Sequence, residues 1–375
     1  MNNQELDSRT METAESSGLH GRHTAGKTER GFFVGQSTKS LGHRDGPDGF
    51  AVIPLNLIWL ALSAGLLLIP GVARAPLYSF QIISFPGDTF TQLLGINDAD
   101  AFFPVIAGYH GATINKGFTL NLGPPVFTPE NFPNSVQTQV TGINDSANTG
   151  GFYVDNCGVN HGFLNINGNF STVDFPGTTF NQVLGLNNTG QAAGYWQTPG
   201  GFDTPFVFNP FLPPGGQFSL IPNLPPGVSA QATDINNKQE LTGFFVGGNG
   251  FLSSAGKLTM LSFPGATETM ALGLNDLDQV VGAYTDAMGH VHGFIYTNGV
   301  FTTVNVPFPL GPDTIVNGIN NFGDIVGFFQ EVPNGNTAVG FVGTPVPEPS
   351  SLSLLALGST SLIGVCILRT RRSFR

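Results

Sequence analysis

The chain has 375 residues, enough for one large domain or two ordinary ones. Only 10% of the residues are charged, against about 25% in an average soluble domain, while 40% are hydrophobic and Gly (51) and Phe (33) are abundant. An apolar fraction of this size can bury a core and argues against general disorder. Residues 76–343 hold 17 Asp or Glu and three Lys, and this net charge of −14 argues strongly against nucleic-acid binding.

The N-terminal part predicts an exported protein. Residues 1–50 are polar, of mixed charge and without periodicity, so we predict a disordered extension there. Within residues 51–75 an apolar run is followed by Pro70-Gly71 and by the small side chains of Ala73 and Ala75, which is the pattern of a signal-peptidase site. We therefore predict a signal peptide that is cleaved after Ala75. The alternative is a retained N-terminal anchor, although the run is short for a membrane span.

The region from residue 76 to 343 consists of six similar units. Each has an Ile or Leu followed by an Asn, and these asparagines are 47, 43, 49, 39 and 45 residues apart. A Gly comes after each Asn, seven positions later in five of the six units, and an aromatic residue follows it directly, or one place later at Tyr284. The repeat-defining residues are Asn97, Asn144, Asn187, Asn236, Asn275 and Asn320.

Each unit predicts four short strands. The Asn-rich segments with a following Gly are typical of tight turns, so residues 186–194 and 319–327 are expected to be hairpins. A Gly-Phe pair begins a third strand, as at Gly162-Phe163, and a β-rich run ending in a Pro turn, as at 170–177, supplies the fourth. Four strands in about 45 residues match one propeller blade.

These features predict an all-β fold, a six-bladed β-propeller-like ring. The last unit stops near Val342 without a fourth strand, while residues 78–87 form an extra strand before the first unit. We expect this N-terminal strand to complete the sixth blade and close the ring, which removes open sheet edges. The alternative is an open β-array.

The units resemble the HAF-type extracellular repeat over nearly all of residues 78–343. The shared pattern is the Asn, the Gly-aromatic pair and then His-Gly-Phe, present here at His161-Gly162-Phe163 and His292-Gly293-Phe294. The resemblance implies secretion and a β-rich array. It implies no particular chemistry.

The C-terminal end predicts a membrane tail. Residues 344–350 form a linker with Pro347, Glu348 and Pro349, and residues 351–368 form an uncharged stretch that just spans a bilayer. The basic end 369–375 follows, and its arginines favour the cytoplasmic side: Arg369, Arg371, Arg372 and Arg375.

This order of segments resembles the PEP-CTERM sorting signal of exopolysaccharide-producing Gram-negative bacteria. The resemblance implies an inner-membrane intermediate, cleavage by an exosortase near the Pro-Glu-Pro and release to the cell surface, with signal peptidase and exosortase as processing partners. The alternative is an ordinary anchor that is never cut.

Few residues suggest chemistry, and no nucleophile elbow, phosphate loop or zinc signature is present. His290 and His292 could share one strand face as metal ligands, but no third ligand is visible and His292 belongs to the repeat. The pairs Asp98/Asp100 and Asp276/Asp278 suggest calcium turns without the complete loop, so turn-forming roles are favoured. Cys157 is interpreted as a packed loop residue, and no cofactor is expected.

Acidic residues near the turns could supply the carboxylate pair of a glycoside hydrolase, but we favour their interpretation as solvated turn residues. They are Asp145, Asp234, Asp276 and Asp324. We therefore expect a non-enzymatic cell-surface or matrix protein that binds exopolysaccharide. The alternatives are an extracellular carbohydrate-active hydrolase or lyase, and a structural or adhesive spacer.

Overall fold

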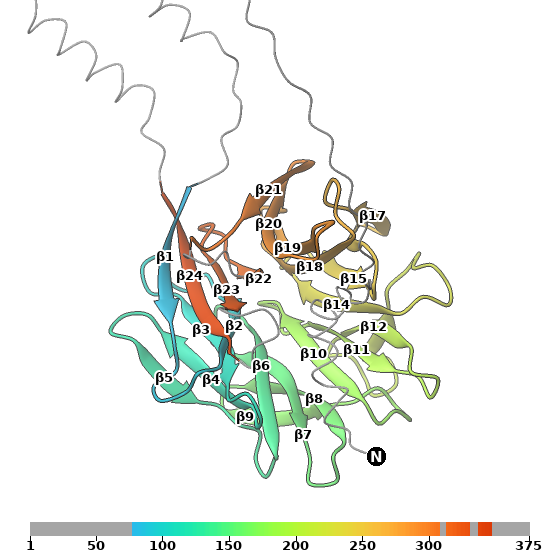
Figure 1. Cartoon of the computed structure of the whole chain (residues 1–375). Coiled ribbons are helices and arrows are strands. Elements are labelled where there is room, and N and C mark those ends of the chain that lie inside the picture. The colour runs from blue at the N-terminus through green and yellow to red at the C-terminus, as the bar shows by residue number, and fades with distance from the viewer. Residues whose placement is uncertain (1–76, 308–312, 331–336, 347–375) are drawn as a thin grey trace, which may run out of the picture. The chain divides into compact units, whose positions relative to one another are not determined.

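The computed structural model describes residues 77–307, 313–330 and 337–346, and these form a ring of six four-stranded antiparallel sheets (Figure 1). The prediction of an all-β six-bladed propeller is confirmed, and the open array is excluded. In every blade the repeat-defining Asn directly follows the innermost strand.

The blades are numbered in chain order. Their strands are, for blade 1, β2 (Thr91–Ile96), β3 (Val105–His110), β4 (Lys116–Asn121) and β5 (Val126–Pro129); for blade 2, β6 (Gln137–Ile143), β7 (Thr149–Val154), β8 (Asn160–Ile166) and β9 (Asn169–Val173); for blade 3, β10 (Asn181–Leu186), β11 (Ala192–Gln197), β12 (Asp203–Phe208) and β13 (Phe218–Leu220); for blade 4, β14 (Ala230–Ile235), β15 (Leu241–Phe245), β16 (Gly250–Ser254) and β17 (Lys257–Leu261); for blade 5, β18 (Glu268–Leu274), β19 (Val280–Thr285), β20 (Val291–Thr297) and β21 (Val300–Val304); and for blade 6, β22 (Asp313–Ile319), β23 (Ile325–Gln330), β24 (Val339–Val346) and β1 (Leu77–Ile83).

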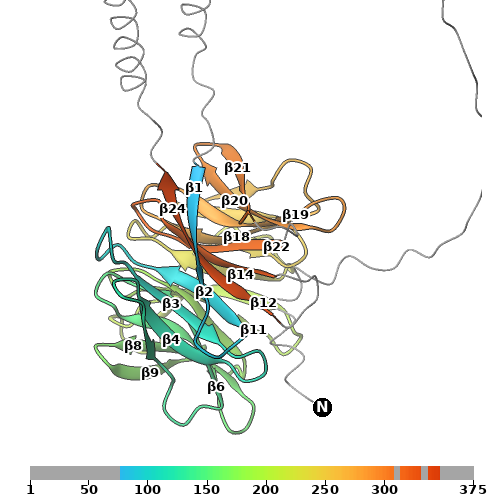
Figure 2. The same ribbon diagram turned by 60° about the vertical axis from the view of Figure 1, so that its left-hand side comes forward.

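The ring is closed by the two ends of the domain. β1 pairs with β24 over seven residues, from Leu77 opposite Val346 to Ile83 opposite Gly340. Figure 2 shows the first and last strands side by side in this sheet. The predicted closure by the N-terminal strand is therefore confirmed, and it joins the first and last strands of the domain by backbone hydrogen bonds rather than leaving two sheet edges.

A cross-strand pair of Gly and Phe repeats in all six blades. The Gly of the second strand lies opposite a completely buried Phe of the third, as Gly194 opposite Phe206. A Cβ on Gly194 would lie 2.0 Å from the Gln182 carbonyl oxygen and 3.0 Å from the Phe206 ring. The ring thus takes the space that a side chain would need. The other pairs are Gly108–Phe118, Gly151–Phe163, Gly243–Phe251, Gly282–Phe294 and Gly327–Phe341.

Other glycines permit neighbouring blades to approach each other. Gly142 of blade 2 faces the backbone of Gly185 in blade 3, and Gly162 faces Val183. At these positions glycine serves contacts between blades. The glycines seven residues after the Asn instead admit the partner strand and the Phe of their own blade.

The apolar core lies between adjacent sheets. One cluster joins Ile295 and Val304 of blade 5 to Val316 and Phe329 of blade 6, and another joins Val342 of blade 6 to blade 1. Each interface buries β-branched and aromatic side chains, which fit pleated surfaces. Stability is therefore distributed around the ring rather than placed in one central core.

The predicted signal peptide and sorting tail lie outside the described residues. Among the residues that are described, no helix is long and apolar enough to cross a membrane. Cys157 is exposed in the β7–β8 turn, so its position in a loop was predicted correctly but its packing was not.

We predict that Gly194→Ala lowers the free energy of unfolding by about 2–3 kcal/mol, because the new methyl group overlaps a backbone oxygen that cannot move freely. Gly216→Ala is the matched control, since the nearest atom to its Cβ is 3.5 Å away. Chemical denaturation monitored by circular dichroism measures both. Equal stability of the two variants would contradict this account of the repeat glycine.

Candidate functional site

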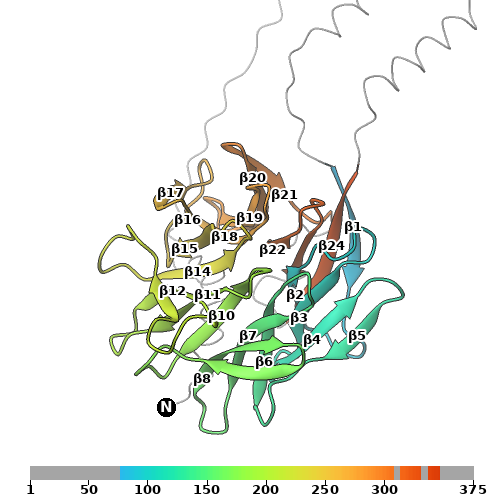
Figure 3. The same cartoon turned by 180° about the vertical axis from the view of Figure 1, so that it is seen from behind.

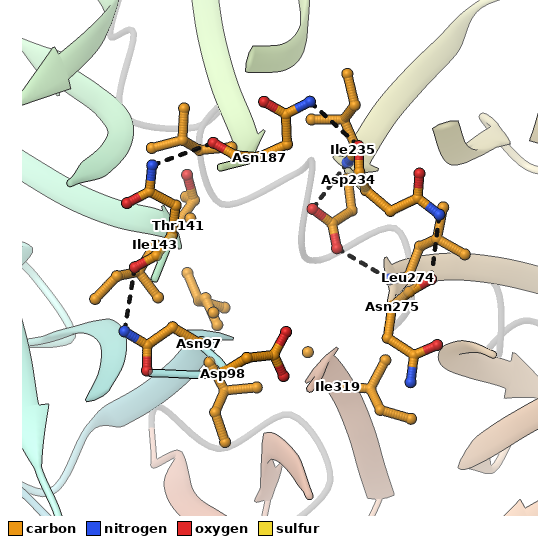
Figure 4. Close-up of a pocket in the computed structure, with 18 of the residues that line it drawn as sticks. Asn97, Asp98, Thr141, Ile143, Asn187, Asp234, Ile235, Leu274, Asn275 and Ile319 are labelled. Carbon is orange, nitrogen blue, oxygen red and sulfur yellow. Dashed lines mark hydrogen bonds between the residues drawn. The ribbon is translucent and has the colours of Figure 1, made fainter. Parts of the chain in front are cut away.

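The hairpins that follow the innermost strands surround one end of the central channel, which we call the mouth (Figures 3 and 4). Each hairpin begins with a repeat-defining Asn, and all six of these side chains are at most 4% exposed. The mouth is therefore built from the most regular part of the sequence. Its lining includes carboxylates, carboxamides and apolar side chains from every blade.

The six asparagines form a closed ring of hydrogen bonds. Each side-chain Nδ2 donates to the backbone carbonyl of the equivalent Asn in the next blade, as from Asn97 to Asn144 at 3.1 Å. Five further bonds complete the circle, and the last joins Asn320 to Asn97 at 3.4 Å. Figure 4 shows several of these bonds around the lumen.

The other end of each amide shapes its own hairpin. In blade 3 the Asn187 Oδ1 accepts the backbone N–H groups of Thr189 and Gln191. In blades 2 to 6 the residue three positions after the Asn has a positive φ, as at Gly190 (79°) and Asp278 (61°). Asn is thus required because one carboxamide satisfies a turn and still joins the next blade. Sequence reasoning found these residues from turn chemistry but missed the bond between blades.

A second ring lies directly above the first, at the residue after each Asn. Each backbone N–H in this ring donates to the side-chain oxygen of the equivalent residue in the next blade, as from Asp98 to Asp145 at 2.7 Å. The members of this second ring are Asp98, Asp145, Asn188, Asn237, Asp276 and Asn321.

Three carboxylates and three carboxamides thus surround the opening, in no regular order. The Asn321 Nδ2 donates to Asp98 at 2.6 Å and to Asp276 at 3.1 Å. Burial raises the pKa of Asp98, and the nearby carboxylates of Asp145 and Asp276 raise it further. The mouth is therefore an acidic, hydrogen-bonded opening whose side chains already have partners.

The carboxylates of this ring are poor candidates for acid–base catalysis. Asp276 accepts the backbone N–H and the Nδ2 of Asn237, and Asp98 does the same for Asn321. Both side chains are held as bridges between blades, which opposes the proton exchange that general acid–base catalysis needs. The hollow below them has a volume of about 80 Å³, room for a few water molecules rather than a sugar ring.

Below the rings, the innermost strands contain a β-bulge, and the bulged residues alternate in character. They are Leu94, Thr141, Leu184, Thr233, Leu272 and Asn317. The three polar ones reach the next blade: Thr141 donates to Val183, Thr233 to Ala271 and Asn317 to Leu93. Blades 2, 4 and 6 therefore differ from blades 1, 3 and 5, and the channel is closer to threefold than to sixfold symmetry at this depth.

Asp234 breaks the pattern of the channel wall. Five blades have Gly two residues before the Asn, whereas blade 4 has this aspartate. Its carboxylate accepts the N–H of Ile235 and, across the interface, of Leu274 in blade 5, both at 2.9 Å. Burial raises its pKa to about 7, against the opposing effect of these two donors. Figure 4 shows the side chain pointing into the lumen, so it keeps some exposed surface within an enclosed hollow.

Exposed apolar side chains surround the mouth. Phe102 is 83% exposed in the long β2–β3 loop, and Leu277 (61%) and Phe322 (50%) lie at the turns of blades 5 and 6. Phe211 is 78% exposed in the β12–β13 loop, and its ring covers Gly190 at the hairpin of blade 3. Sequence reasoning missed this rim, because in the sequence these are single apolar residues inside polar turns.

The structure does not bring the candidate metal ligands together in one site. His292 bonds to Asp286 and Asn305, whereas the side chain of His290 is exposed in the preceding turn, outside β20. Asp276 and Asp278 share the hairpin turn of blade 5 but have different partners. Asp278 pairs with Lys238 at 2.7 Å, whereas Asp276 accepts bonds from Asn237. Within the described ranges no group of three His, Cys, Asp or Glu could hold a metal ion.

The remaining acidic candidates, Asp100 and Asp324, also have structural roles. Asp100 accepts the N–H groups of Phe102 and Phe103 in the blade 1 loop. The Asp324 carboxylate accepts a bond from the Asn320 Nδ2, its backbone N–H donates to the Asn320 Oδ1, and burial raises the pKa of its carboxyl group. The predicted processing residues Ala73, Ala75 and Pro347 to Pro349, and the terminal arginines, lie outside the described part of the chain.

Comparison with known proteins identifies the tail. Residues 345–372 match the PEP-CTERM protein-sorting motif. The chain is therefore an exported surface protein with a C-terminal membrane-anchoring tail that is processed by an exosortase. No curated protein matches the chain, and the resemblance to HAF-type repeats stays a prediction.

Several solved structures are weakly similar to the chain. AofleA from Arthrobotrys oligospora is 11% identical with a TM-score of 0.45, covering 71% of this chain and 86% of that one. A fucose-specific lectin from Aleuria aurantia is 13% identical with a TM-score of 0.41, covering 70% and 99%. TolB from Acinetobacter baumannii is 10% identical with a TM-score of 0.43, covering 68% and 65%. Likenesses this weak carry no argument about function.

We predict that Asn187→Ala costs about 2–4 kcal/mol of unfolding free energy, because it removes one bond of the closed ring and leaves buried backbone groups without partners. Asn169→Ala is the control, since that exposed side chain bonds only within its own turn. Thermal and denaturant unfolding measure both. A cost below that of the control would show that the ring is dispensable.

The raised pKa of Asp234 predicts a stability that depends on pH. The folded protein holds the proton more tightly than the unfolded chain, so the contribution is full below about pH 4 and is lost as the pH rises to about 7. Asp234→Gly, which restores the residue of the other blades, should therefore gain up to about 4 kcal/mol relative to the wild type between pH 4 and pH 8.

Asp234→Asn is the second variant, because it keeps the size and removes the titration. Unfolding free energies measured across this pH range for the three proteins provide the comparison. A difference between wild type and both variants that does not change with pH would contradict the raised pKa.

Proposed function

We propose that this exported protein is a non-enzymatic binding module that holds extracellular polysaccharide at the mouth. The observation that carries the proposal is the combination, on one face, of a ring of carboxylates and carboxamides with a rim of exposed aromatic side chains. Exposed apolar groups gathered around a polar opening are typical of interaction sites. The sorting tail supports this setting, because it directs the protein to the cell surface.

The negative charge of the site limits the classes of polysaccharide that can bind. Three carboxylates surround the opening, at Asp98, Asp145 and Asp276, and the nearest cation, Lys238, is paired with Asp278. A polyanionic polymer would be repelled by this field. We therefore propose neutral or amine-bearing sugars, with amide and carboxylate oxygens accepting hydroxyl or ammonium hydrogens and Phe102 and Phe211 covering the apolar faces of the sugar rings.

The test is binding of purified protein to exopolysaccharide of the producing bacterium, by calorimetry, with release of reducing ends followed in the same samples. We expect saturable binding without release. Phe102→Ala and Phe211→Ala should each weaken binding on the order of tenfold. Phe202→Ala is the control, since Phe202 is 51% exposed in the β11–β12 loop at the opposite end of the channel.

Other results would point elsewhere. Release of reducing ends that Asp276→Asn abolishes would favour the carbohydrate-active enzyme, because Asp98 and Asp276 share the amide of Asn321 and could act as a carboxylate pair. Neither binding nor release, with the variants still folded, would favour a structural spacer.

A further inference from the structure

The mouth and the origin of the tail lie on the same face of the ring. β24 ends at Val346, and its Pro345 packs against Gly323 in the first hairpin of blade 6. Opposite it, the Tyr78 hydroxyl at the start of β1 donates to the Gly323 carbonyl at 3.1 Å. Both ends of the domain therefore leave beside the mouth (Figure 1).

The exposed rim is concentrated around the same blade. Phe322 belongs to blade 6, Leu277 to blade 5 and the pair Phe102 and Phe103 to blade 1. These blades are consecutive around the ring, with the tail-bearing blade in the middle. We call these four side chains the tail-side rim. An apolar arc in this position is what a surface needs when it is held against a membrane at one edge.

The sequence leaves little distance between the ring and the bilayer. Residues 347–350 separate Val346 from the apolar stretch that begins at residue 351, and a chain of this length reaches at most about 18 Å when fully extended. The headgroup layer alone is about 5–7 Å thick. An anchored ring must therefore keep its mouth edge within about 13 Å of the outer surface of the headgroup layer.

We propose that, while the tail is attached, the tail-side rim rests on the zwitterionic surface of the bilayer and turns the mouth toward the membrane. Tethering gives a high effective concentration, so a few apolar side chains are enough to hold this orientation. Cleavage of the tail by the exosortase removes the tether, so the mouth no longer faces the membrane. The exported protein then meets extracellular ligands only after processing.

The acidic groups near the rim define which lipids fit. Asp98, Asp100, Asp276 and Asp278 lie beside the tail-side rim, so an anionic lipid surface opposes the contact. The inference therefore commits to zwitterionic headgroups. It does not depend on the nature of the extracellular ligand.

The test uses the full chain in phosphatidylcholine nanodiscs with spin-labelled lipid, in a Cys157→Ser, Cys366→Ser background. A fluorophore is attached at Phe322→Cys and, as the matched control of nearly equal exposure, at Phe202→Cys on the opposite face. We expect lipid quenching at position 322 to exceed that at 202 severalfold. Equal quenching at the two positions would overturn the orientation.

A second set of proteins separates the rim from the tether. Replacing Phe102, Phe103 and Leu277 by Ser should reduce quenching at position 322 by about twofold or more, because the tail alone lets the ring swing away. Circular dichroism verifies that these exposed changes leave the fold intact. Unchanged quenching, or an increase on adding phosphatidylglycerol, would overturn docking by the rim. Because no polysaccharide is present, these results stand apart from those of the binding assay.

Discussion

The rest of the structure depends on the buried carboxamides that connect each blade to the next. A propeller has no single central core, so its blades must be held in register at the channel, where the backbones converge. Here one Asn per blade has two roles. Its Oδ1 fixes the hairpin of its own blade, and its Nδ2 bonds to the next blade. The loss of one such side chain therefore removes both the bond to the next blade and the support of its own turn.

Closure by β1 and β24 completes the same constraint at the periphery. Without the N-terminal strand, blade 6 would expose an edge, and the ring of asparagines would have to hold blades 6 and 1 together alone. The pairing also places the start of β1 and the end of β24 at the mouth face. The architecture that stabilises the ring therefore also sets which face is nearest to the membrane anchor.

Departures from the repeat are more informative than the repeat. The bulged residues alternate between Leu and a polar side chain, and Asp234 replaces a channel glycine with an acid whose pKa burial raises to about 7. A repeat kept only for packing would retain glycine there, because the carboxylate costs stability at neutral pH. The exposed aromatics are likewise confined to the turns and loops of particular blades, which gives a nearly symmetric ring an asymmetric face.

How much could be predicted depends on whether a signal is local or spread over the ring. The sequence alone determined the all-β class, the six units, the order of strands and the closing strand, because turn residues and β-branched runs act over a few positions. It also located the sorting tail, since length and charge define such a segment.

Only the tertiary structure decided what the repeated residues do. Asn187 reads as a turn residue in sequence, and its bond to Asn236 spans 49 positions that only closure of the ring brings together. The glycines seven positions after each Asn are only a repeat pattern in the sequence, and strand pairing shows that they admit a Phe of their own blade. The mouth and its rim could not be predicted for the same reason: one residue from each of six distant turns becomes a single surface only when the ring is closed.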